Sequence, residues 1–241
     1  MNSKQYQDAW DKRVGEGTAH IDGHKDYEEL ERDYFLPAVK GLKLSKKTVI
    51  DYGCGGGQFG KFLDKTVRGL KQYIGIDISN RSLNAARTLL GKAVVLMKID
   101  PYEFPDLSIL KADFLFCMNV IQHFPTKEYL DRWIENINKS GIGHIILQYR
   151  PGPLKFSENP YKTTHEINMA NTVPGKYITD CLSNYKFKNL NNIPGWVFGK
   201  VEFAKGGIYT GKSLLGANGH EHSIPVSSEV KVTSGFEVKT P

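Results

Sequence analysis

The stretch Thr48-Val-Ile-Asp-Tyr-Gly-Cys-Gly-Gly-Gly-Gln-Phe-Gly60 decides the fold of this chain. It begins as a short apolar strand and runs directly into a glycine-rich turn. Gly53, Gly55 and Gly57 carry no Cβ, so the backbone can turn tightly and a ligand can approach it closely. A strand that enters such a turn predicts the first βα unit of a nucleoside-binding fold.

A second apolar stretch, Tyr73-Ile-Gly-Ile-Asp-Ile-Ser79, supports this prediction. It places Asp77 about 20 residues beyond the glycine turn, where a carboxylate usually binds the ribose hydroxyls of a nucleoside. We therefore expect a nucleoside cofactor to bind between the two stretches.

Strands and helices alternate through the middle of the chain. Further strands are expected at 93–99, 113–118 and 143–148. Helices are predicted between them: one opens after the glycine turn, one is capped by Ser79 or Asn80 and ends at Gly91, and one is capped by Thr126. Near-continuous apolar strands separated by helices predict a parallel sheet that is covered on both faces.

The segments on either side of this unit carry other signals. Before it, a helix is expected from Asp26 to Gly41, with a kink at Pro37. After it, the stretch 149–176 is punctuated by prolines and is too long for a simple connection, so a lid or substrate loop is predicted. A helical segment is expected next, at 177–182.

The end of the chain is less regular. Two strands are predicted at 187–193 and 196–203, joined by a turn at Pro194-Gly195. The tail 205–241 is rich in glycine and serine, and its alternating pattern predicts a small hairpin at 230–238. The pattern indicates no function for this tail.

Composition sets limits on the class of protein. The chain has 241 residues, 40% of them hydrophobic, which suits one α/β domain with additions. Its formal net charge is +6 and its pI about 9.0, so an anionic substrate or partner is open. Lysines and arginines are scattered along the sequence rather than clustered, which disfavours a nucleic-acid function without excluding it.

The cysteines and the N-terminus indicate the compartment. Cys54, Cys117 and Cys181 are odd in number and far apart, so neither a disulfide framework nor a zinc site is predicted. The N-terminus lacks the apolar segment of a signal peptide, and no apolar run reaches the roughly 18 residues of a membrane helix. We expect a cytoplasmic protein without a membrane partner, and the sequence leaves its oligomeric state open.

Taken together, these motifs resemble the class I S-adenosylmethionine-dependent methyltransferases. The resemblance rests on Asp51-x-Gly53-x-Gly55-x-Gly57, Asp77, Asp100 after the third strand, and Asn119-Val-Ile-Gln-His-Phe124 after the fourth. It covers residues 45–204, with the lid at 149–176 inside them. It implies a doubly wound, mostly parallel seven-stranded sheet of Rossmann-like type with a reversed last strand. Residues 1–44 would then form an N-terminal helical cap.

The resemblance also implies roles at the glycine turn. Asp51 and the turn formed by Gly53, Gly55 and Gly57 would face the methionine end and the sugar of S-adenosylmethionine. The glycine spacing alone also admits a dinucleotide, because the glycines from Gly55 to Gly60 fit G-x-G-x-x-G. Asp51 favours S-adenosylmethionine, since its carboxylate would repel a pyrophosphate and attract a cationic amino-acid group.

Further cofactor contacts are implied at the ends of the next strands. Asp77 would accept hydrogen bonds from both ribose hydroxyls, and Ile78 would lie against the adenine. Asp100 would sit near the adenine amine. Asn119 would lie beside the sulfonium, near the mouth of the substrate site.

A methyltransferase that acts on oxygen benefits from a general base. His123, just beyond the fourth strand, is the first candidate, and the alternative is a histidine that packs against the next helix. His165, beside Glu166 on the predicted lid, is the second, and the alternative is an exposed loop histidine. Tyr149 and Arg150 end the fifth strand and would bind an acidic or hydroxylated substrate, or anchor the lid.

The methyl acceptor is the least determined property. Asn119-Val-Ile-Gln stands where amino-methylating DNA enzymes carry Asn/Asp-Pro-Pro-Tyr/Phe, and the Pro-Cys pair of cytosine C5 enzymes is missing there. No metal site is predicted, because His220 and His222 lack a third ligand. We therefore predict methyl transfer to an O or N atom of a small molecule. The alternatives are an RNA, DNA or protein methyltransferase, or a catalytically silent module that binds a partner.

Overall fold

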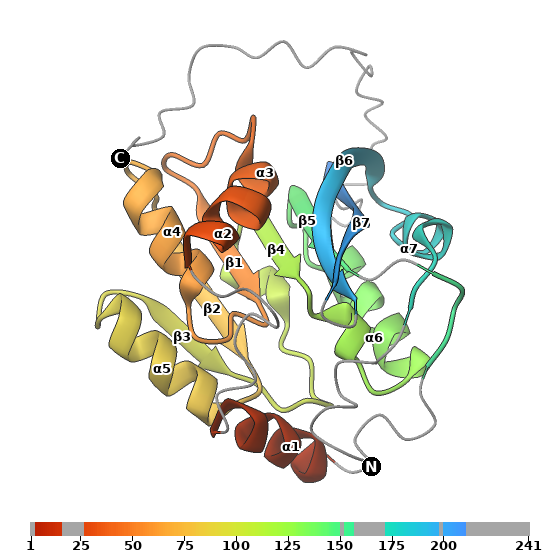
Figure 1. Cartoon of the computed structure of the whole chain (residues 1–241), viewed down its shortest axis with the longest axis horizontal. Coiled ribbons are helices and arrows are strands. Elements are labelled where there is room, and N and C mark those ends of the chain that lie inside the picture. Colours follow the sequence, from red (N-terminus) through yellow and green to blue (C-terminus); the bar gives the residue numbers. More distant parts are fainter. Residues whose placement is uncertain (1–2, 16–26, 150–151, 157–171, 198–199, 211–241) are drawn as a thin grey trace.

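The computed structural model describes residues 3–15, 27–149, 152–156, 172–197 and 200–210. Over these residues the chain forms one central sheet with helices on both of its faces (Figure 1). In chain order, the elements are α1 (Ser3–Gly15), α2 (Tyr27–Leu30), η1 (Glu31–Phe35), α3 (Leu36–Val39), β1 (Thr48–Tyr52), α4 (Gln58–Thr66), β2 (Gln72–Asp77), α5 (Asn80–Leu90), β3 (Val95–Lys98), η2 (Leu107–Leu110), β4 (Phe114–Met118), η3 (Ile121–His123), α6 (Lys127–Lys139), β5 (His144–Gln148), α7 (Gly175–Cys181), β6 (Lys186–Val197) and β7 (Lys200–Thr210).

The strands are ordered β3-β2-β1-β4-β5-β7-β6. From β3 to β5 all neighbouring strands are parallel, whereas β7 is antiparallel to both β5 and β6. The prediction of a parallel α/β sheet is confirmed. The strand order reverses between β1 and β4, and ligands of open α/β sheets bind at such a point, at the carboxyl ends of the strands.

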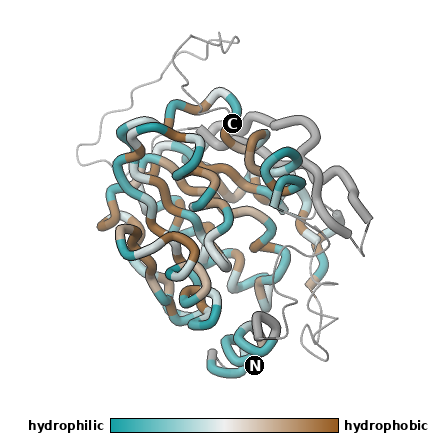
Figure 2. Tube along the Cα trace, turned by 60° about the vertical axis from the view of Figure 1, so that its left-hand side comes forward, coloured by the Kyte–Doolittle hydropathy of each residue, from teal (hydrophilic) through white to brown (hydrophobic). Residues whose placement is uncertain are grey.

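Each face of the sheet has its own hydrophobic core. Alternate residues of β1 point to opposite faces, so Ile50 packs with Trp133 of α6 while Val49 packs with Phe62 of α4. All residues of β1 are buried, as expected of a strand that is covered on both sides. Figure 2 shows hydrophobic residues concentrated in the strands at the centre, whereas α1 is largely hydrophilic.

The helix predicted before the first strand is present, and its disturbed middle has a local cause. α2, η1 and α3 follow one another without a break, and η1 is a π-helical turn. The Leu36 amide donates to the carbonyl of Glu31, five residues back. Pro37 has no amide hydrogen to continue the regular ladder, which is why the irregularity lies directly before it.

The predicted helix caps are confirmed. The Ser79 hydroxyl accepts a hydrogen bond from the Ser82 amide at 3.0 Å, and Thr126 caps α6 through the Tyr129 amide at 3.1 Å. Gly91, at φ +76°, ends α5. These caps fix where α5 and α6 begin, immediately beyond β2 and beyond the segment after β4.

The predicted turn at Pro194-Gly195 is wrong. Both residues lie inside β6, where Pro194 pairs with Phe203 and Gly195 with Glu202. Proline is tolerated there because β6 is the last strand of the sheet, so its missing amide hydrogen need not serve a further strand. The register also shifts between Leu190 and Ile193, just before the proline.

The stretch predicted as a lid is described only at its two ends. Lys155 and Thr172 exchange two backbone hydrogen bonds of 3.1 Å, so the chain leaves and returns at one place. The predicted hairpin at 230–238 and both tail histidines lie outside the described residues. Among the described residues, no helix combines the length and hydrophobicity that a membrane span requires.

Candidate cofactor and acceptor site

The glycine turn between β1 and α4 is packed on both flanks and open in the middle. A Cβ on Gly53 would lie 2.4 Å from the Val120 side chain, and one on Gly57 would lie 2.9 Å from Leu90. A Cβ on Gly55 would meet no atom within 4 Å. All three glycines have positive φ, so the sequence supplies the residue that this backbone requires. The open position at Gly55 is the place where a ligand can approach the backbone.

Asp77 ends β2 directly beside this turn. Its Oδ2 accepts the Gly55 amide at 2.9 Å, and its Oδ1 accepts the Ser79 amide at 2.8 Å. Each carboxylate oxygen keeps further acceptor capacity, enough for two hydroxyl groups. Burial raises the pKa of Asp77 to about 6 in spite of these hydrogen bonds, and the charge of Asp11 adds to the rise.

Asp51 lies beneath the turn and is only 4% exposed. Its Oδ2 accepts a hydrogen bond from the Tyr73 hydroxyl at 2.7 Å. Burial raises the pKa of Asp51 to about 7, against the effect of that hydrogen bond, and the charge of Asp77 adds to the rise. Two carboxylates held in this way would both be stabilised by a nearby cation.

The residues expected around the adenine follow β2 and β3. Ile78 is partly buried against the core of the sheet. The Ile99 amide donates to the Asp77 carbonyl at 3.1 Å, and Asp100 Oδ1 accepts the Tyr102 amide at 2.8 Å. The fold thus brings Ile78 and Asp100 to the same edge of the sheet as Asp77.

Asn119 follows β4 in a left-handed conformation, with φ +57°. Its amide donates to the Gln148 carbonyl at 2.8 Å, and its side-chain oxygen accepts from Gln122 at 3.4 Å. The side-chain oxygen of Gln122 is buried and has no hydrogen-bond partner among the described residues. A buried acceptor without a partner at this point is a place for a ligand's donor group.

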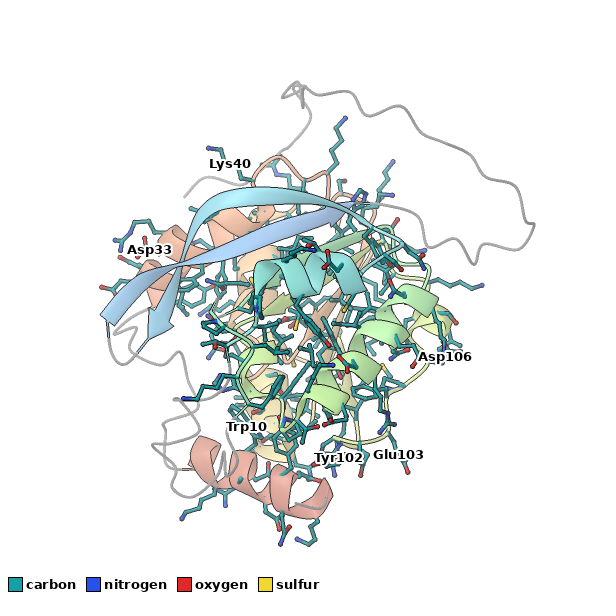
Figure 3. All side chains as sticks on the ribbon, turned by 90° about the vertical axis from the view of Figure 1, so that its right-hand side faces the viewer. Trp10, Asp33, Lys40, Tyr102, Glu103 and Asp106 are labelled. Atoms are coloured by element: carbon teal, nitrogen blue, oxygen red, sulfur yellow. The ribbon has the colours of Figure 1, made fainter. Side chains whose placement is uncertain are left out.

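Helix α1, which the sequence pattern does not reveal, lies across this edge. The Tyr6 hydroxyl donates to the His123 carbonyl at 2.9 Å, and the Trp10 ring meets the His123 ring edge-on at 5.1 Å between centroids. Directly after Trp10, Asp11 accepts the Ser79 hydroxyl at 2.6 Å. α1 therefore spans from the end of β2 to the segment after β4. Figure 3 shows Trp10 reaching from α1 toward the body of the protein.

The candidate base and substrate residues fall into different places. His123 is at the candidate site, is partly exposed, and its ring packs against Trp10 of α1. Tyr149 is 1% exposed and belongs to the core beneath α7, where burial raises its pKa to about 12. Arg150 and His165 lie outside the described residues. Tyr6 and Trp10, at i and i+4 of a polar segment, are the signal that would have indicated α1.

Comparison with known proteins agrees with this geometry. Residues 43–198 match a family model described as a methyltransferase domain. The chain belongs to this methyltransferase family. The match spans the glycine turn and all the cofactor-binding residues predicted above, and it identifies a class I S-adenosylmethionine-dependent enzyme. No curated protein matches the sequence significantly.

Several solved structures share the fold of this methyltransferase. Magnesium protoporphyrin IX methyltransferase from Synechocystis PCC 6803, solved with S-adenosylhomocysteine, has a TM-score of 0.60 and 14% identity over 87% of this chain and 99% of that chain. A phosphoethanolamine N-methyltransferase from Haemonchus contortus has a TM-score of 0.55 and 15% identity, and the match covers 77% of this chain and 47% of that chain. The [4+2]-cyclase SpnF has a TM-score of 0.58 and 16% identity, and the match covers 79% of this chain and 77% of that chain. At these identities the likeness establishes the fold.

Family membership implies S-adenosylmethionine as the cofactor, and the residues present fit it. The open position at Gly55 admits a ligand to the backbone of the turn. Asp77 offers acceptor oxygens to a pair of hydroxyls, as a ribose requires. The buried carboxylates of Asp51 and Asp77 suit a cation and would oppose a pyrophosphate.

Proposed function

We propose that this methyltransferase transfers a methyl group to an oxygen or nitrogen atom of a small-molecule acceptor. The observation that carries the proposal is the position of α1. Tyr6 is 3% exposed and Trp10 rests on His123, so α1 covers the edge of the sheet where cofactor and acceptor must meet. A covered site suits an acceptor that can be enclosed together with the cofactor.

The residues of the chain divide the work of binding. Asp77 would hold the ribose, Ile78 would lie against the adenine with Asp100 nearby, and the glycine turn with Asp51 would face the methionine end. Asn119 marks the sulfonium end. When bound, S-adenosylmethionine supplies an electrophilic methyl group on its sulfonium. Enclosure then contributes to rate, because reacting groups held in line no longer have to find each other.

The acceptor is oriented by the segment after β4. The partnerless side-chain oxygen of Gln122 can accept a hydrogen bond from the acceptor, and the side-chain NH2 of Asn119 can donate one to it. His123 takes the proton from an acceptor hydroxyl or ammonium, since imidazole titrates in the range that this task requires. On the covered edge, Trp10 covers one side of the His123 ring, which stays partly exposed.

The charges at this edge favour a neutral or cationic acceptor. Asp11, Asp51, Asp77 and Asp100 all lie there. A polyanionic acceptor would have to approach these carboxylates against repulsion. These carboxylates support a small molecule over RNA or DNA as the acceptor, although Lys12 of α1 and Arg81 of α5 bring positive charge to the same edge.

The three cysteines support a reducing compartment. Cys54 and Cys117 are buried thiols and Cys181 is a partly exposed one, and none of them forms a disulfide. Such thiols persist where glutathione or thioredoxin keeps them reduced. We infer that the enzyme acts in the cytoplasm.

Two measurements test the proposal. Isothermal calorimetry with S-adenosylhomocysteine checks cofactor binding, and a screen with methyl-labelled S-adenosylmethionine against metabolite pools, RNA and peptides identifies the acceptor class. We expect binding of the cofactor product and label in the metabolite pool. Label only in RNA or peptides would replace the proposed acceptor. No binding and no transfer would favour a silent module that binds a partner.

A further inference from the structure

The edge of the sheet opposite the site carries a cluster of positive charge. The loops before β1, β2 and β4 lie there, because the amino ends of parallel strands meet at one edge. These loops contribute five exposed basic residues, here called the amino-edge basic surface: Lys43, Lys46, Arg68, Lys71 and Lys111. Figure 3 places Lys40, at the start of the first loop, far from Trp10 and Tyr102.

Backbone hydrogen bonds hold the three loops side by side. The Lys46 amide donates to the Gly69 carbonyl at 2.6 Å, and the Lys71 amide donates to the Lys47 carbonyl at 3.0 Å. The Asp113 amide donates to the Thr48 carbonyl at 2.9 Å. Neighbouring strands are about 4.8 Å apart, so β2, β1 and β4 place these loops within about 10 Å. Residues that are scattered in sequence are therefore gathered in space.

The positive charge of this surface is barely compensated. Asp113 is the one carboxylate in loops 43–47, 68–71 and 111–113; it pairs with Lys47 at 2.8 Å, and the charge of Lys71 also acts on it. Among the described residues, no carboxylate lies within ion-pairing distance of the five members of the surface. The remaining charge is available to a polyanion.

Two of the five lysines and arginines sit in strained backbone. Lys46 has φ +61° and Lys111 has φ +46°, a conformation in which glycine is the easier residue. Among the described residues, the remaining side-chain-bearing residue with positive φ is Asn119 at the candidate site. Residues with a strained backbone are often found at functional sites, where the side chain is retained although the strain lowers stability.

We infer that the amino-edge basic surface binds the phosphate backbone of a polynucleotide. A nucleic-acid strand presents one phosphate about every 3.4 Å, so about four phosphates fall within reach of this surface. A membrane is a poorer fit, because interfacial binding needs an apolar face, and the one large exposed apolar residue described beside these loops is Ile109 of η2, 67% exposed. The bound strand lies at the edge opposite the site, so it docks the enzyme and is not the methyl acceptor.

The test is fluorescence anisotropy of the full-length protein with a labelled single-stranded RNA of about 20 nucleotides. With about four contacts, the slope of log K against log salt is about −3, so binding weakens about 50-fold between 50 and 200 mM salt. Arg68→Gln/Lys71→Gln should weaken binding about 10-fold at 50 mM and flatten the slope by about 1.5. The charge-matched control Lys61→Gln/Lys98→Gln lies outside the surface and should change neither.

Lys46→Gly/Lys111→Gly separates binding from folding. This variant should weaken RNA binding to a similar extent while raising the melting temperature by about 2–4 °C, because it relieves left-handed strain. Equal loss in the control variant, no RNA binding at 50 mM salt, or tighter binding to vesicles of anionic phospholipid would each overturn the inference. Binding of S-adenosylhomocysteine should be unchanged in all three variants, so the outcome does not depend on the proposed methyl transfer.

Discussion

The pKa values of aspartates are shifted in opposite directions at the two edges of the sheet. At the carboxyl edge, burial raises the pKa of Asp51 to about 7 and that of Asp77 to about 6. At the amino edge, burial also opposes ionisation of Asp113, but hydrogen bonds from Lys47 and Thr48 outweigh it, and the pKa of Asp113 lies below its usual value. Among the described residues, no cation pairs with the first two carboxylates, whereas the third pairs with Lys47.

This difference distinguishes an aspartate that stabilises the fold from aspartates that are proposed to bind a ligand. Asp113 stabilises the fold when ionised because its partner is part of the chain. Burial disfavours the ionised forms of Asp51 and Asp77, and we propose that a positive ligand offsets this penalty. Each prediction below changes one member of this contrast.

The largest effect is expected at His123, at the carboxyl edge. His123→Gln should lower the methyl-transfer rate by about 10²–10⁴-fold, the usual contribution of a general base, while leaving the affinity for S-adenosylhomocysteine nearly unchanged. The measurement is kcat with the acceptor from the screen, together with calorimetry. A pH–rate profile that loses its acidic limb in the variant would identify proton transfer.

A histidine at the amino edge provides the control. His144 begins β5, stacks on Phe114 at 4.6 Å, and has its pKa lowered by burial. His144→Gln should affect stability but not kcat. If both histidine variants lose activity equally, the loss at His123 reflects packing against Trp10 rather than proton transfer.

The next largest effect concerns stability without cofactor. Asp51→Asn should raise the free energy of unfolding by about 4 kcal/mol at pH 8, because a pKa about three units above the unfolded value corresponds to that penalty. The folded state holds the proton that the unfolded state has lost, so stability falls as pH rises from about 4 to 7. At pH 4.5 the gain should shrink to about 1 kcal/mol. Urea denaturation at both pH values checks this.

The same variant should bind the cofactor less well, because it removes the charge that attracts a cation. An Asp51→Asn protein that is equally stable at pH 8 and binds S-adenosylmethionine with unchanged affinity would contradict both parts of the prediction. Tyr73→Phe is the companion variant, since it removes the hydrogen bond that favours ionised Asp51. It should raise the pKa of Asp51 further.

Cofactor affinity should depend strongly on Asp77. Asp77→Ala should weaken binding of S-adenosylhomocysteine by about 1.5–3 kcal/mol, the scale of hydrogen bonds to a charged group. Asp106→Ala removes an exposed carboxylate that bonds only to Ser108, and should leave affinity unchanged. Calorimetry measures both, and equal affinities for the two variants would exclude Asp77 from the ribose site.

The sequence predicts the carboxyl edge well, because local chemistry determines it. The glycine turn needs residues without a Cβ, and both the cap at Ser79 and the strand before it are short-range signals. The position of Asp77 beside the glycine turn could therefore be predicted before the fold was known. The strand order follows once parallel strands alternate with helices.

Other features depend on contacts between distant residues, which a local pattern cannot reveal. α1 is polar and lies across the site through contacts to residues more than sixty positions away. Pro194 predicts a turn from the local sequence, because only the strand order of the whole sheet shows that it lies in an edge strand, where proline is tolerated. The basic residues look scattered because strand order, not sequence, brings their loops together.

The smallest effect is expected at Asp113, and its sign is opposite to that at Asp51. Asp113→Asn should lower the free energy of unfolding at pH 7 by about 0.2–1 kcal/mol, as expected for a partly exposed ion pair. Because its folded pKa is depressed, this contribution is present above the unfolded pKa and disappears as pH falls through the folded value. The two variants should thus shift stability in opposite directions at neutral pH.

Asp113→Asn also links the fold to the amino-edge basic surface. Without the carboxylate, the Lys47 ammonium loses its partner and adds one positive charge to the surface. RNA binding should therefore become stronger while the protein becomes slightly less stable, with a salt slope steeper by about 0.7 for one further contact. If binding weakened in step with stability, Asp113 would be acting through loop structure, and the charge of this edge would not be what attracts the strand.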